Sequence, residues 1–336
     1  MNSLERIRAA VTFHTPDRVP VIGQVFGHAA TLADIPLEKY IQNGEVLADC
    51  QLQALEFYGY DAVFALMDVH VEAEAAGSVL EYRPGQYPFV SSHALAEGAS
   101  LSSLSVPDPR IDGRMPQLLK AAEILRDRVG DDVLVVGCVA GPMTLAIQLL
   151  GIENALYLAA DDPEEFARLL AFSAEVITVF GAAQIEAGVH LPVVFDPSAS
   201  PAIIPPQFFR EFELPLLTKI FKSFKEAGAE LNWLHITGPT EKILSYYPDA
   251  GVDIANIDYC VESGTATKVL PHTCIDGNIK PLLFLEERPD SVEKEAAELL
   301  NLFSGRGGYI LSPGCEIPPE AKPENIMRLV SAVHKN

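Results

Sequence analysis

Positively charged side chains are scarce in this 336-residue chain, which has 24 Lys and Arg against 46 Asp and Glu and a formal net charge of −22. No run rich in Lys or Arg offsets this acidic excess. Nucleic-acid binding takes much of its affinity from cations placed against phosphates, so the composition disfavours that class of function. A polyanionic small molecule would likewise need a local cluster of cations.

Cysteines and long apolar runs are also few. The five cysteines are odd in number and form no C-x-x-C pair, which predicts reduced thiols and no disulfide framework. Residues 1–8 form a mixed amphipathic segment, and no apolar run reaches the roughly 18–20 residues of a membrane span. We therefore expect no signal peptide, no membrane span and a cytoplasmic location. The cysteines are Cys50, Cys138, Cys260, Cys274 and Cys315.

Two common nucleotide-binding signatures are absent, G-x-G-x-x-G after a first strand and G-x-x-x-x-G-K-[ST]. The 49% hydrophobic content instead forms short apolar runs that alternate with longer helical patterns. This alternation is typical of a parallel sheet covered on both faces. The predicted strands are 61–65, 133–137, 191–195, 231–234, 253–256, 273–275 and 309–311, and the predicted helices include 116–129, 163–187, 206–227 and 291–303.

Seven predicted strands, with an eighth that the pattern does not locate, indicate an α/β fold, the (β/α)₈ TIM barrel. We expect a single domain over residues 1–336. Within it, residues 1–60 form a helical extension at the N-terminus. The segment over about 71–112, rich in Gly, Pro and Ser, is predicted to be an insertion after the first strand.

Polar or special-geometry residues follow each predicted strand, and chemistry in a barrel gathers at the carboxyl ends of the strands. The alternative for such residues is that they cap the following helices, and Asp258 and Asn278 suit that role best. The segments after the strands are 68–72, 138–142, 196–198, 235–238, 258, 276–278 and 315.

His235 and Cys315 are the natural pair among these residues. A neutral imidazole and a thiolate both suit zinc, which takes about four N, S and O ligands. A third ligand would come from Asp68, His70 or Glu72, which alternation places on one face of an extended segment. The alternative is that Cys315 is a packed thiol and that His235 forms hydrogen bonds in a polar barrel mouth.

These stretches resemble the uroporphyrinogen decarboxylase superfamily, and more closely its branch of cobalamin-dependent methyltransferases. The resemblance runs nearly end to end and implies a (β/α)₈ barrel with the site at the carboxyl ends of the strands. It is carried by TPDRVPV at 15–21, YDAV at 60–63, DVHVEAEAAG at 68–77, GPMTLA at 141–146, FDP at 195–197, HITG at 235–238, GNI at 277–279, SPGC at 312–315 and PENI at 323–326.

Two departures separate the branches. The decarboxylases hold a polycarboxylate with an arginine-bearing stretch early in the chain, whereas residues 21–30 here contain no Arg or Lys. Buried anions without such partners would be desolvated without compensation. The decarboxylases also tend to have histidine where this chain has Cys315. Both departures favour the methyltransferase branch.

The resemblance to that branch implies a zinc site built from a His-x-Cys segment and a late Gly-Cys. His235 and Cys315 match this pattern, but Thr237 stands at the middle cysteine. The resemblance then implies an enzyme that moves a methyl group from a methyl ether, methylamine or methanol-type donor to the cobalt of a partner corrinoid protein, as in a multicomponent O-demethylase. The alternatives are a methylcobalamin:thiol methyltransferase like those acting on coenzyme M, a decarboxylase-like enzyme and a non-catalytic binding barrel.

Methyl transfer from an ether requires stabilisation of the departing oxygen by a metal or a general acid. We expect His235, Asp196 and His70 to be the catalytic candidates. An apolar pocket for the donor would include Phe26, Met143 and Tyr259, for which packing in the core is the commoner role. His28 and Asn278 complete the predicted substrate-binding set.

Overall fold

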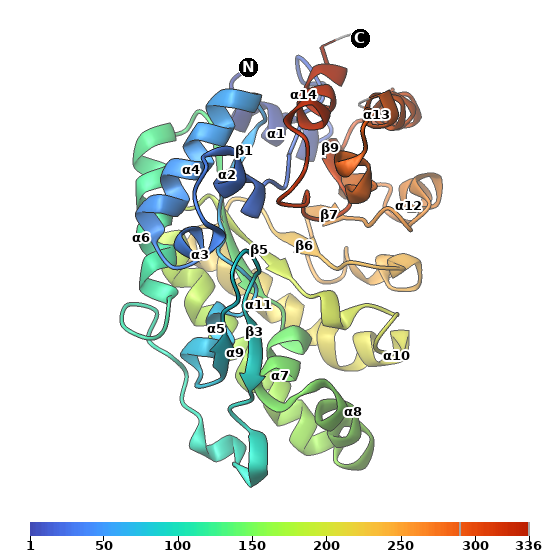
Figure 1. The fold of residues 1–336 in the computed structure, drawn as a ribbon. Coiled ribbons are helices and arrows are strands. Elements are labelled where there is room, and N and C mark those ends of the chain that lie inside the picture. Colours follow the sequence, from blue (N-terminus) through green and yellow to red (C-terminus); the bar gives the residue numbers. More distant parts are fainter. Residues whose placement is uncertain (289, 335–336) are drawn as a thin grey trace.

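The computed structural model describes residues 1–288 and 290–334, and a curled parallel sheet of seven strands forms its centre (Figure 1). The sheet order is β1-β4-β5-β6-β7-β8-β9, and every pairing in it is parallel. All seven predicted strands are confirmed. Their bounds are β1 Ala62–Ala65, β4 Leu134–Ala140, β5 Leu191–Phe195, β6 Trp233–His235, β7 Ile254–Asn256, β8 Cys274–Ile279 and β9 Tyr309–Pro313.

The eighth barrel position lies between β9 and β1 and is taken by a short extended segment around Val21. Val21 forms a parallel bridge with Leu311, and the Ile22 N–H donates to the Leu311 carbonyl at 3.0 Å. On the other side, the Asp61 N–H donates to the Val21 carbonyl at 2.8 Å. The predicted N-terminal extension over 1–60 therefore contains the segment that joins the two edges of the sheet.

Helices surround the sheet, and each predicted helix is present. The predicted helix over 206–227 is divided into α10, a π-helical turn η4 and α11. The α-helices are α1 Ser3–Val11, α2 Gly27–Leu32, α3 Leu37–Tyr40, α4 Gly44–Tyr58, α5 Val71–Ala75, α6 Met115–Val129, α7 Pro142–Leu150, α8 Ile152–Asp161, α9 Pro163–Glu186, α10 Pro206–Phe208, α11 Leu214–Ala227, α12 Ser263–Val269, α13 Asp290–Phe303 and α14 Pro323–Ala332, and η4 is Phe209–Glu213. The 3₁₀ turns are η1 Ala96–Gly98, η2 Leu101–Ser103, η3 Pro197–Ala199, η5 Thr240–Lys242, η6 Leu244–Tyr246 and η7 Pro281–Leu285.

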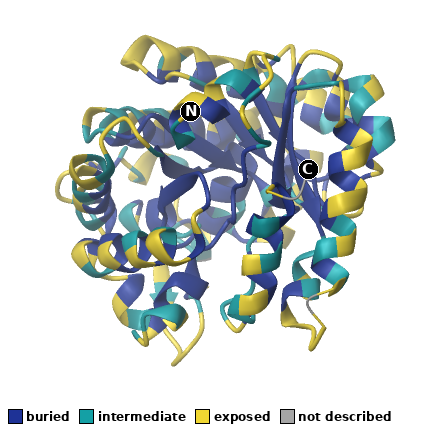
Figure 2. Ribbon diagram, turned by 90° about the horizontal axis from the view of Figure 1, so that it is seen from above, coloured by how far each residue is buried: buried dark blue, intermediate teal, exposed yellow. Residues whose placement is uncertain are grey.

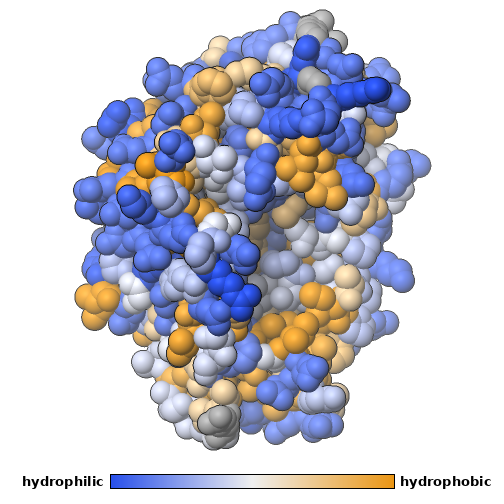
Figure 3. Space-filling model, viewed as in Figure 1, coloured by the Kyte–Doolittle hydropathy of each residue, from blue (hydrophilic) through white to orange (hydrophobic). Residues whose placement is uncertain are grey.

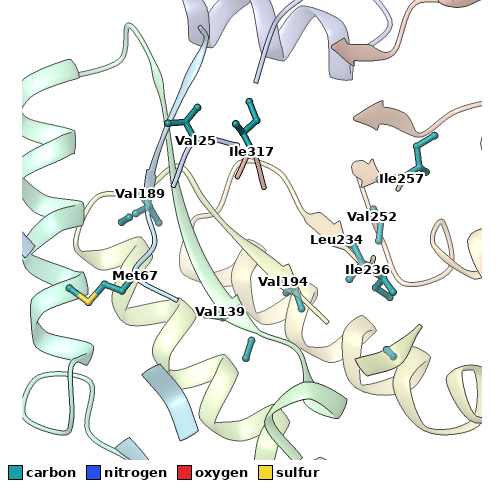
Figure 4. Close-up of a cluster of buried hydrophobic side chains, with 14 of the residues drawn as sticks. Val25, Met67, Val139, Val189, Val194, Leu234, Ile236, Val252, Ile257 and Ile317 are labelled. Atoms are coloured by element: carbon teal, nitrogen blue, oxygen red, sulfur yellow. The ribbon is translucent and has the colours of Figure 1, made fainter. Parts of the chain in front are cut away.

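Alternation along the strands produces two hydrophobic clusters, because successive side chains point to opposite faces of a sheet. The inner cluster fills the barrel with residues such as Phe64, Val193 and Trp233, and it includes Leu4 and Ile7 of α1. The outer cluster lies between the sheet and the helices and includes Val139, Val194 and Leu234, labelled in Figure 4. Seen from above, buried residues occupy the sheet and the inner faces of the helices (Figure 2).

Helix α9 is the one described helix long and apolar enough to cross a membrane, and half of its most apolar window is buried inside the protein. Its buried residues include Phe166, Ile177 and Phe180, which belong to the outer hydrophobic cluster. The bent pair α7 and α8 passes the same test together. Packing in the core accounts for the apolar character of α9, since a helix between a sheet and its neighbours is hydrophobic over a wide face.

The insertion after β1 contains α5 and an antiparallel hairpin of β2 (Val79–Glu81) and β3 (Phe89–Ser92). Its hairpin loop brings Tyr87 back to the barrel, where the Tyr87 hydroxyl lies 2.9 Å from the N–H of Gly27. The insertion therefore supplies a residue to the carboxyl end of the barrel.

Candidate functional site

A cavity of about 280 Å³ lies at the carboxyl ends of the barrel strands. Its lining comes from the ends of β5 and β6 and from the segments that follow β1 and β9. It is mostly apolar, with a few polar groups, which is the usual composition of a small-molecule site. The lining residues are Phe26, Leu66, Met67, Asp68, Val69, His70, Tyr87, Phe195, Pro197, His235, Thr237, Cys315 and Glu316. On the face shown in Figure 3, hydrophobic side chains stand beside hydrophilic ones around a central hollow.

His235 ends strand β6 and is 1% exposed. Its ring packs against Phe195, with ring centroids 4.5 Å apart. Among the described residues, neither ring nitrogen has a hydrogen-bond partner. Burial lowers the pKa of His235 to about 3, so the imidazole is neutral at neutral pH. A buried polar group without a partner is costly, so His235 is a candidate for contact with a ligand.

Cys315 follows β9 and lines the same cavity as His235. The backbone brings it there from Gly314, whose N–H donates to the Ile279 carbonyl at 2.8 Å. Burial raises the pKa of the Cys315 thiol to about 12, although a hydrogen bond with the Glu316 backbone acts to lower it. Without a bound cation, Cys315 is therefore a neutral thiol at neutral pH.

Glu316 and Tyr87 form a polar pair in the cavity lining. The Glu316 carboxylate accepts a hydrogen bond from the Tyr87 hydroxyl at 2.6 Å and from the Gly27 N–H at 3.1 Å. Burial raises the pKa of Glu316 to about 7, although both hydrogen bonds act to lower it. None of the described ion pairs involves this carboxylate.

Asp68 and His70 also line the cavity, and the Asp68 carboxylate, unlike that of Glu316, is paired with a cation. Arg114 donates to both Asp68 oxygens, and the His70 backbone N–H donates to Oδ1 at 2.9 Å. Burial acts to raise the pKa of Asp68, but hydrogen bonds from His70 and the Arg114 cation outweigh it and lower the pKa. Glu72 lies outside the lining, where it accepts a hydrogen bond from the Ala140 N–H at 2.7 Å.

A layer of polar side chains lies inside the barrel at the level of His235. Asn256 and Asp276 are its register partners on the next two strands, and the Asn256 amide donates to Asp276 Oδ2 at 2.7 Å. Gln24 donates to Ser312 Oγ at 3.0 Å. One oxygen each of Gln24, Asn256 and Asp276 has no described partner. Burial raises the pKa of Asp276 to about 7.

Asp196 points away from the cavity, toward the start of α7. Its carboxylate accepts hydrogen bonds from the Thr144 hydroxyl at 2.7 Å and from the N–H groups of Thr144 and Met143. This is the geometry of a helix cap supplied by a neighbouring strand. Burial raises the pKa of Asp196 to about 6 and also raises the pKa of the nearby Glu213.

Four further predicted residues lie outside the lining. Met143 is buried at the start of α7. His28 makes contacts with Pro319 O and the Tyr58 hydroxyl. Asn278 donates to two carbonyls of the loop after β7, which it holds in place. Tyr259 is half exposed, with the Lys280 ammonium 5.6 Å from its ring centroid. Of the predicted substrate-binding set, Phe26 alone lines the cavity.

Sequence reasoning missed Tyr87 and Glu316. Glu316 directly follows the predicted site residue Cys315, and this adjacency could have identified it as a site candidate. Tyr87 lies in the hairpin of the insertion, far along the chain from the end of every strand of the parallel sheet, and no local pattern connects it to the barrel.

The metal-binding capacity of the site depends on its donors. Within residues 1–288 and 290–334, no group of three His, Cys, Asp or Glu side chains is arranged to hold a metal ion. Asp68 is paired with Arg114, and Glu72 lies outside the cavity lining, where it accepts from the Ala140 N–H. Thr237 lines the cavity but supplies only a hydroxyl. His235 and Cys315 are two donors, whereas zinc takes about four. His70, the remaining predicted candidate, also lines the cavity, but among the described residues it does not form a three-donor group with them. The residues present do not fit a tightly bound zinc ion.

The chain is similar over nearly its whole length to proteins of one family. A family model described as "Uroporphyrinogen decarboxylase (URO-D)" matches residues 2–336. The chain is 28% identical to "Methylcobamide:CoM methyltransferase MtaA" of Methanosarcina barkeri, over 97% of this chain and 96% of that protein. It is also 28% identical to "Uroporphyrinogen decarboxylase" of Syntrophotalea carbinolica, over 87% and 84%. A solved "methyltransferase from Methanosarcina mazei" has a TM-score of 0.90 and 27% identity, covering 100% of this chain and 99% of that one.

Proposed function

The chain belongs to the uroporphyrinogen decarboxylase family, and on that premise we propose that it is a methyltransferase that moves a methyl group from a small donor to the cobalt of a corrinoid. A partner protein presents the corrinoid, and the donor is a methyl ether or a methylated amine. We propose that this protein and the corrinoid protein meet in the cytoplasm.

The observation that carries this proposal is the composition of the cavity. Its lining contains His235 and Cys315, the two residues that match the methyltransferase branch, and no Lys or Arg. A porphyrinogen with many carboxylates would need several cations there, because each unpaired buried anion is costly. The acidic residues of the described lining are Asp68, which is paired with Arg114, and Glu316, whose carboxylate would repel such a substrate further.

The reaction transfers a methyl group between two atoms outside the protein. The bond from the methyl carbon to the donor's heteroatom breaks, and its electron pair stays on that heteroatom. A pair from cob(I)alamin forms the new bond from carbon to cobalt. The residues of the chain orient the methyl group toward the corrinoid and exclude water, so that the two reactants meet in one geometry. Phe26, Phe195 and Leu66 form the apolar wall that does this.

The second candidate function is methyl transfer from a methylated corrinoid to a thiol. Its support is the full-length similarity to the methylcobamide:CoM methyltransferase, together with His235 and Cys315. That chemistry usually relies on a metal-bound thiolate, and the donor set here lacks the third ligand. For this reason we rank it below transfer to cobalt.

The test uses the purified protein, reduced cob(I)alamin without oxygen, and a panel of methyl donors that includes methoxy-aromatics and methylated amines. Formation of methylcobalamin, followed by its absorbance, is expected with at least one donor. The reverse assay supplies methylcobalamin and coenzyme M, and faster turnover there would establish the second candidate. Turnover of uroporphyrinogen without any methyl transfer would overturn both.

A further inference from the structure

We propose that the methyl donor is an onium cation, a quaternary ammonium or sulfonium compound, held between the aromatic walls of the cavity and the Glu316 carboxylate. This inference rests on the proposed function. It restricts the methyl donor to cations, which excludes the ethers and adds sulfonium compounds to the methylated amines. It follows from three properties of the cavity, which are its aromatic geometry, its charge and the leaving group that its residues can support.

Three aromatic rings line the cavity. Phe26 and Phe195 both line it, and their rings are perpendicular with centroids 6.1 Å apart. Tyr87 adds a third ring from the insertion. A cation within about 6 Å of a ring centroid is attracted by the negative face of the ring, and aromatic cages of this kind recognise quaternary ammonium groups.

The charge of the lining is also that of a cation site. Asp68 is neutralised by the two Arg114 hydrogen bonds, whereas Glu316 has neutral partners, the Tyr87 hydroxyl and the Gly27 N–H. The lining contains no Lys or Arg that could serve as a counter-ion. A cationic donor in the cavity would therefore face a carboxylate that the described part of the chain leaves without a countercharge.

The chemistry of the leaving group agrees with the side chains present. Attack on an onium methyl breaks the bond from carbon to nitrogen or sulfur, and the departing amine or sulfide is neutral. Cobalt supplies two electrons and rises from Co(I) to Co(III) as the methyl group binds, and no proton is consumed. An ether would instead release an oxyanion that needs an acid or a metal. The cavity lacks a three-donor metal set among the described residues.

The first test measures binding to the whole protein without cobalamin. Isothermal titration compares choline with 3,3-dimethylbutan-1-ol, its neutral isostere, which has the same shape and no charge. Choline is expected to bind about tenfold more tightly, as a cation–π site with a carboxylate requires. Equal affinities for the two compounds would overturn the inference, and this measurement needs no variant to fold.

The second test uses Glu316→Gln, whose amide oxygen still accepts from Tyr87 and Gly27 and so preserves the fold. Affinity for choline is expected to fall about tenfold, while affinity for the neutral isostere stays unchanged. Glu320→Gln is the matched control, because Glu320 is an exposed carboxylate four residues further along the chain and outside the lining. A similar loss in both variants would show a general charge effect and contradict the role of Glu316.

The transfer assay separates this inference from the proposed function. Methylcobalamin formed from tetramethylammonium, choline or dimethylsulfoniopropionate, and formed faster than from methoxy-aromatics, supports both. Transfer from methoxy-aromatics alone overturns the onium inference and leaves the methyltransferase intact. Selective onium binding without transfer from any donor supports the cation site and overturns the proposed function.

Discussion

Buried carboxylates at the two ends of the barrel differ in their partners: Asp61 at the amino end is bound by cations, and Glu316 and Asp276 at the carboxyl end are bound by neutral groups. At the amino end, Asp61 accepts hydrogen bonds from Arg6 Nη1, from two nitrogens of Arg18, from Ser3 Oγ and from the Val21 N–H, at 2.7–2.9 Å. At the carboxyl end, Glu316 and Asp276 have no described ion pair. Asp61 is saturated by cations, whereas Glu316 and Asp276 are held only by neutral groups. Asp68 is the exception at the carboxyl end, because Arg114 pairs with it.

This difference separates stability from function along the barrel axis. Asp61 joins α1, the Arg18 segment and Val21 of the eighth barrel position, so its contacts hold the N-terminal segment against the barrel. At the opposite end, the described part of the chain offers no hydrogen-bond partner to His235 or to one oxygen each of Asn256 and Asp276. In barrels of this kind the amino end serves stability and the carboxyl end serves chemistry. The following changes test that division, from the largest expected effect to the smallest.

Asp61→Asn should have the largest effect on stability. The amide cannot satisfy two guanidinium groups. Arg18 would lose the carboxylate that its described hydrogen bonds reach, and Arg6 would keep only Asp17 as a carboxylate partner. We expect the free energy of unfolding to fall by about 3–5 kcal/mol, measured by urea denaturation. Asp17→Asn is the control, because Asp17 is half exposed and should cost about 1 kcal/mol or less. Equal losses of unfolding free energy in the two variants would show that Asp61 contributes no more to stability than an exposed carboxylate.

His235→Leu should separate activity from stability. It removes two unpartnered nitrogens and leaves a side chain of suitable volume, so unfolding should change by about 1 kcal/mol or less in either direction. Methyl transfer should fall about 100-fold, because His235 lines the cavity that holds the donor and its loss would change how the donor is placed. The control is Trp233→Phe on the same strand, outside the cavity lining, which should cost about 1–2 kcal/mol and keep the activity of the folded protein. Full activity of His235→Leu would end its assignment to the site.

The stability of the protein should fall as pH rises, and Asp276 should account for part of the fall. Its pKa is about 7 in the folded state against an ordinary value of 3.8, so the folded protein binds this proton more tightly than the unfolded chain. The unfolding free energy therefore decreases between about pH 4 and pH 7, and this group contributes about 1–2 kcal/mol of the decrease between pH 5.5 and 8.

Asp276→Asn removes the ionisation and should flatten this dependence, with a gain of stability at pH 8 relative to wild type. Urea denaturation at pH 5.5 and pH 8 measures it. Asp127→Asn, at an exposed position of α6, should leave the wild-type slope unchanged. A wild-type slope in Asp276→Asn would show that other buried carboxyls, such as Glu72 with its pKa of about 7, dominate the pH dependence.

Thr237→Cys should change stability least while altering metal binding. It would add a third donor to His235 and Cys315 in the same cavity. We expect the variant to hold about one zinc ion after gel filtration, and the wild-type protein to hold less than about 0.2 equivalents. Thr240→Cys is the control, because Thr240 is buried outside the lining. One equivalent of zinc in the wild-type protein would show that its donor set is complete without a cysteine at 237.

Much of the fold could be predicted because its signals are local. Each of the seven predicted strands is a continuous apolar run, and β4 and β5 are buried at every position. The eighth position could not be located, since a single bridge at Val21 leaves no run of apolar residues to detect. The candidate site was predicted in part, with His235, Cys315, Phe26, His70 and Asp68 now found around one cavity.

The remaining features depend on contacts between distant segments. Asp196 and Asn278 carry the polar groups that a site would use, yet their hydrogen bonds go to α7 and to the loop after β7. Tyr87 reaches Glu316 across more than two hundred residues of chain. A sequence pattern reports the period of burial but not which polar atoms meet.

The sequence by itself determined the barrel, the family and the position of His235 and Cys315 at strand ends, because burial periodicity and short motifs are properties of neighbouring residues. Only the tertiary structure decided which carboxylates have cations. Asp61 and Asp68 are matched by arginines from other segments, and Glu316 is not. Charge compensation depends on distances of a few ångströms between segments far apart in the chain, and the linear sequence does not contain those distances.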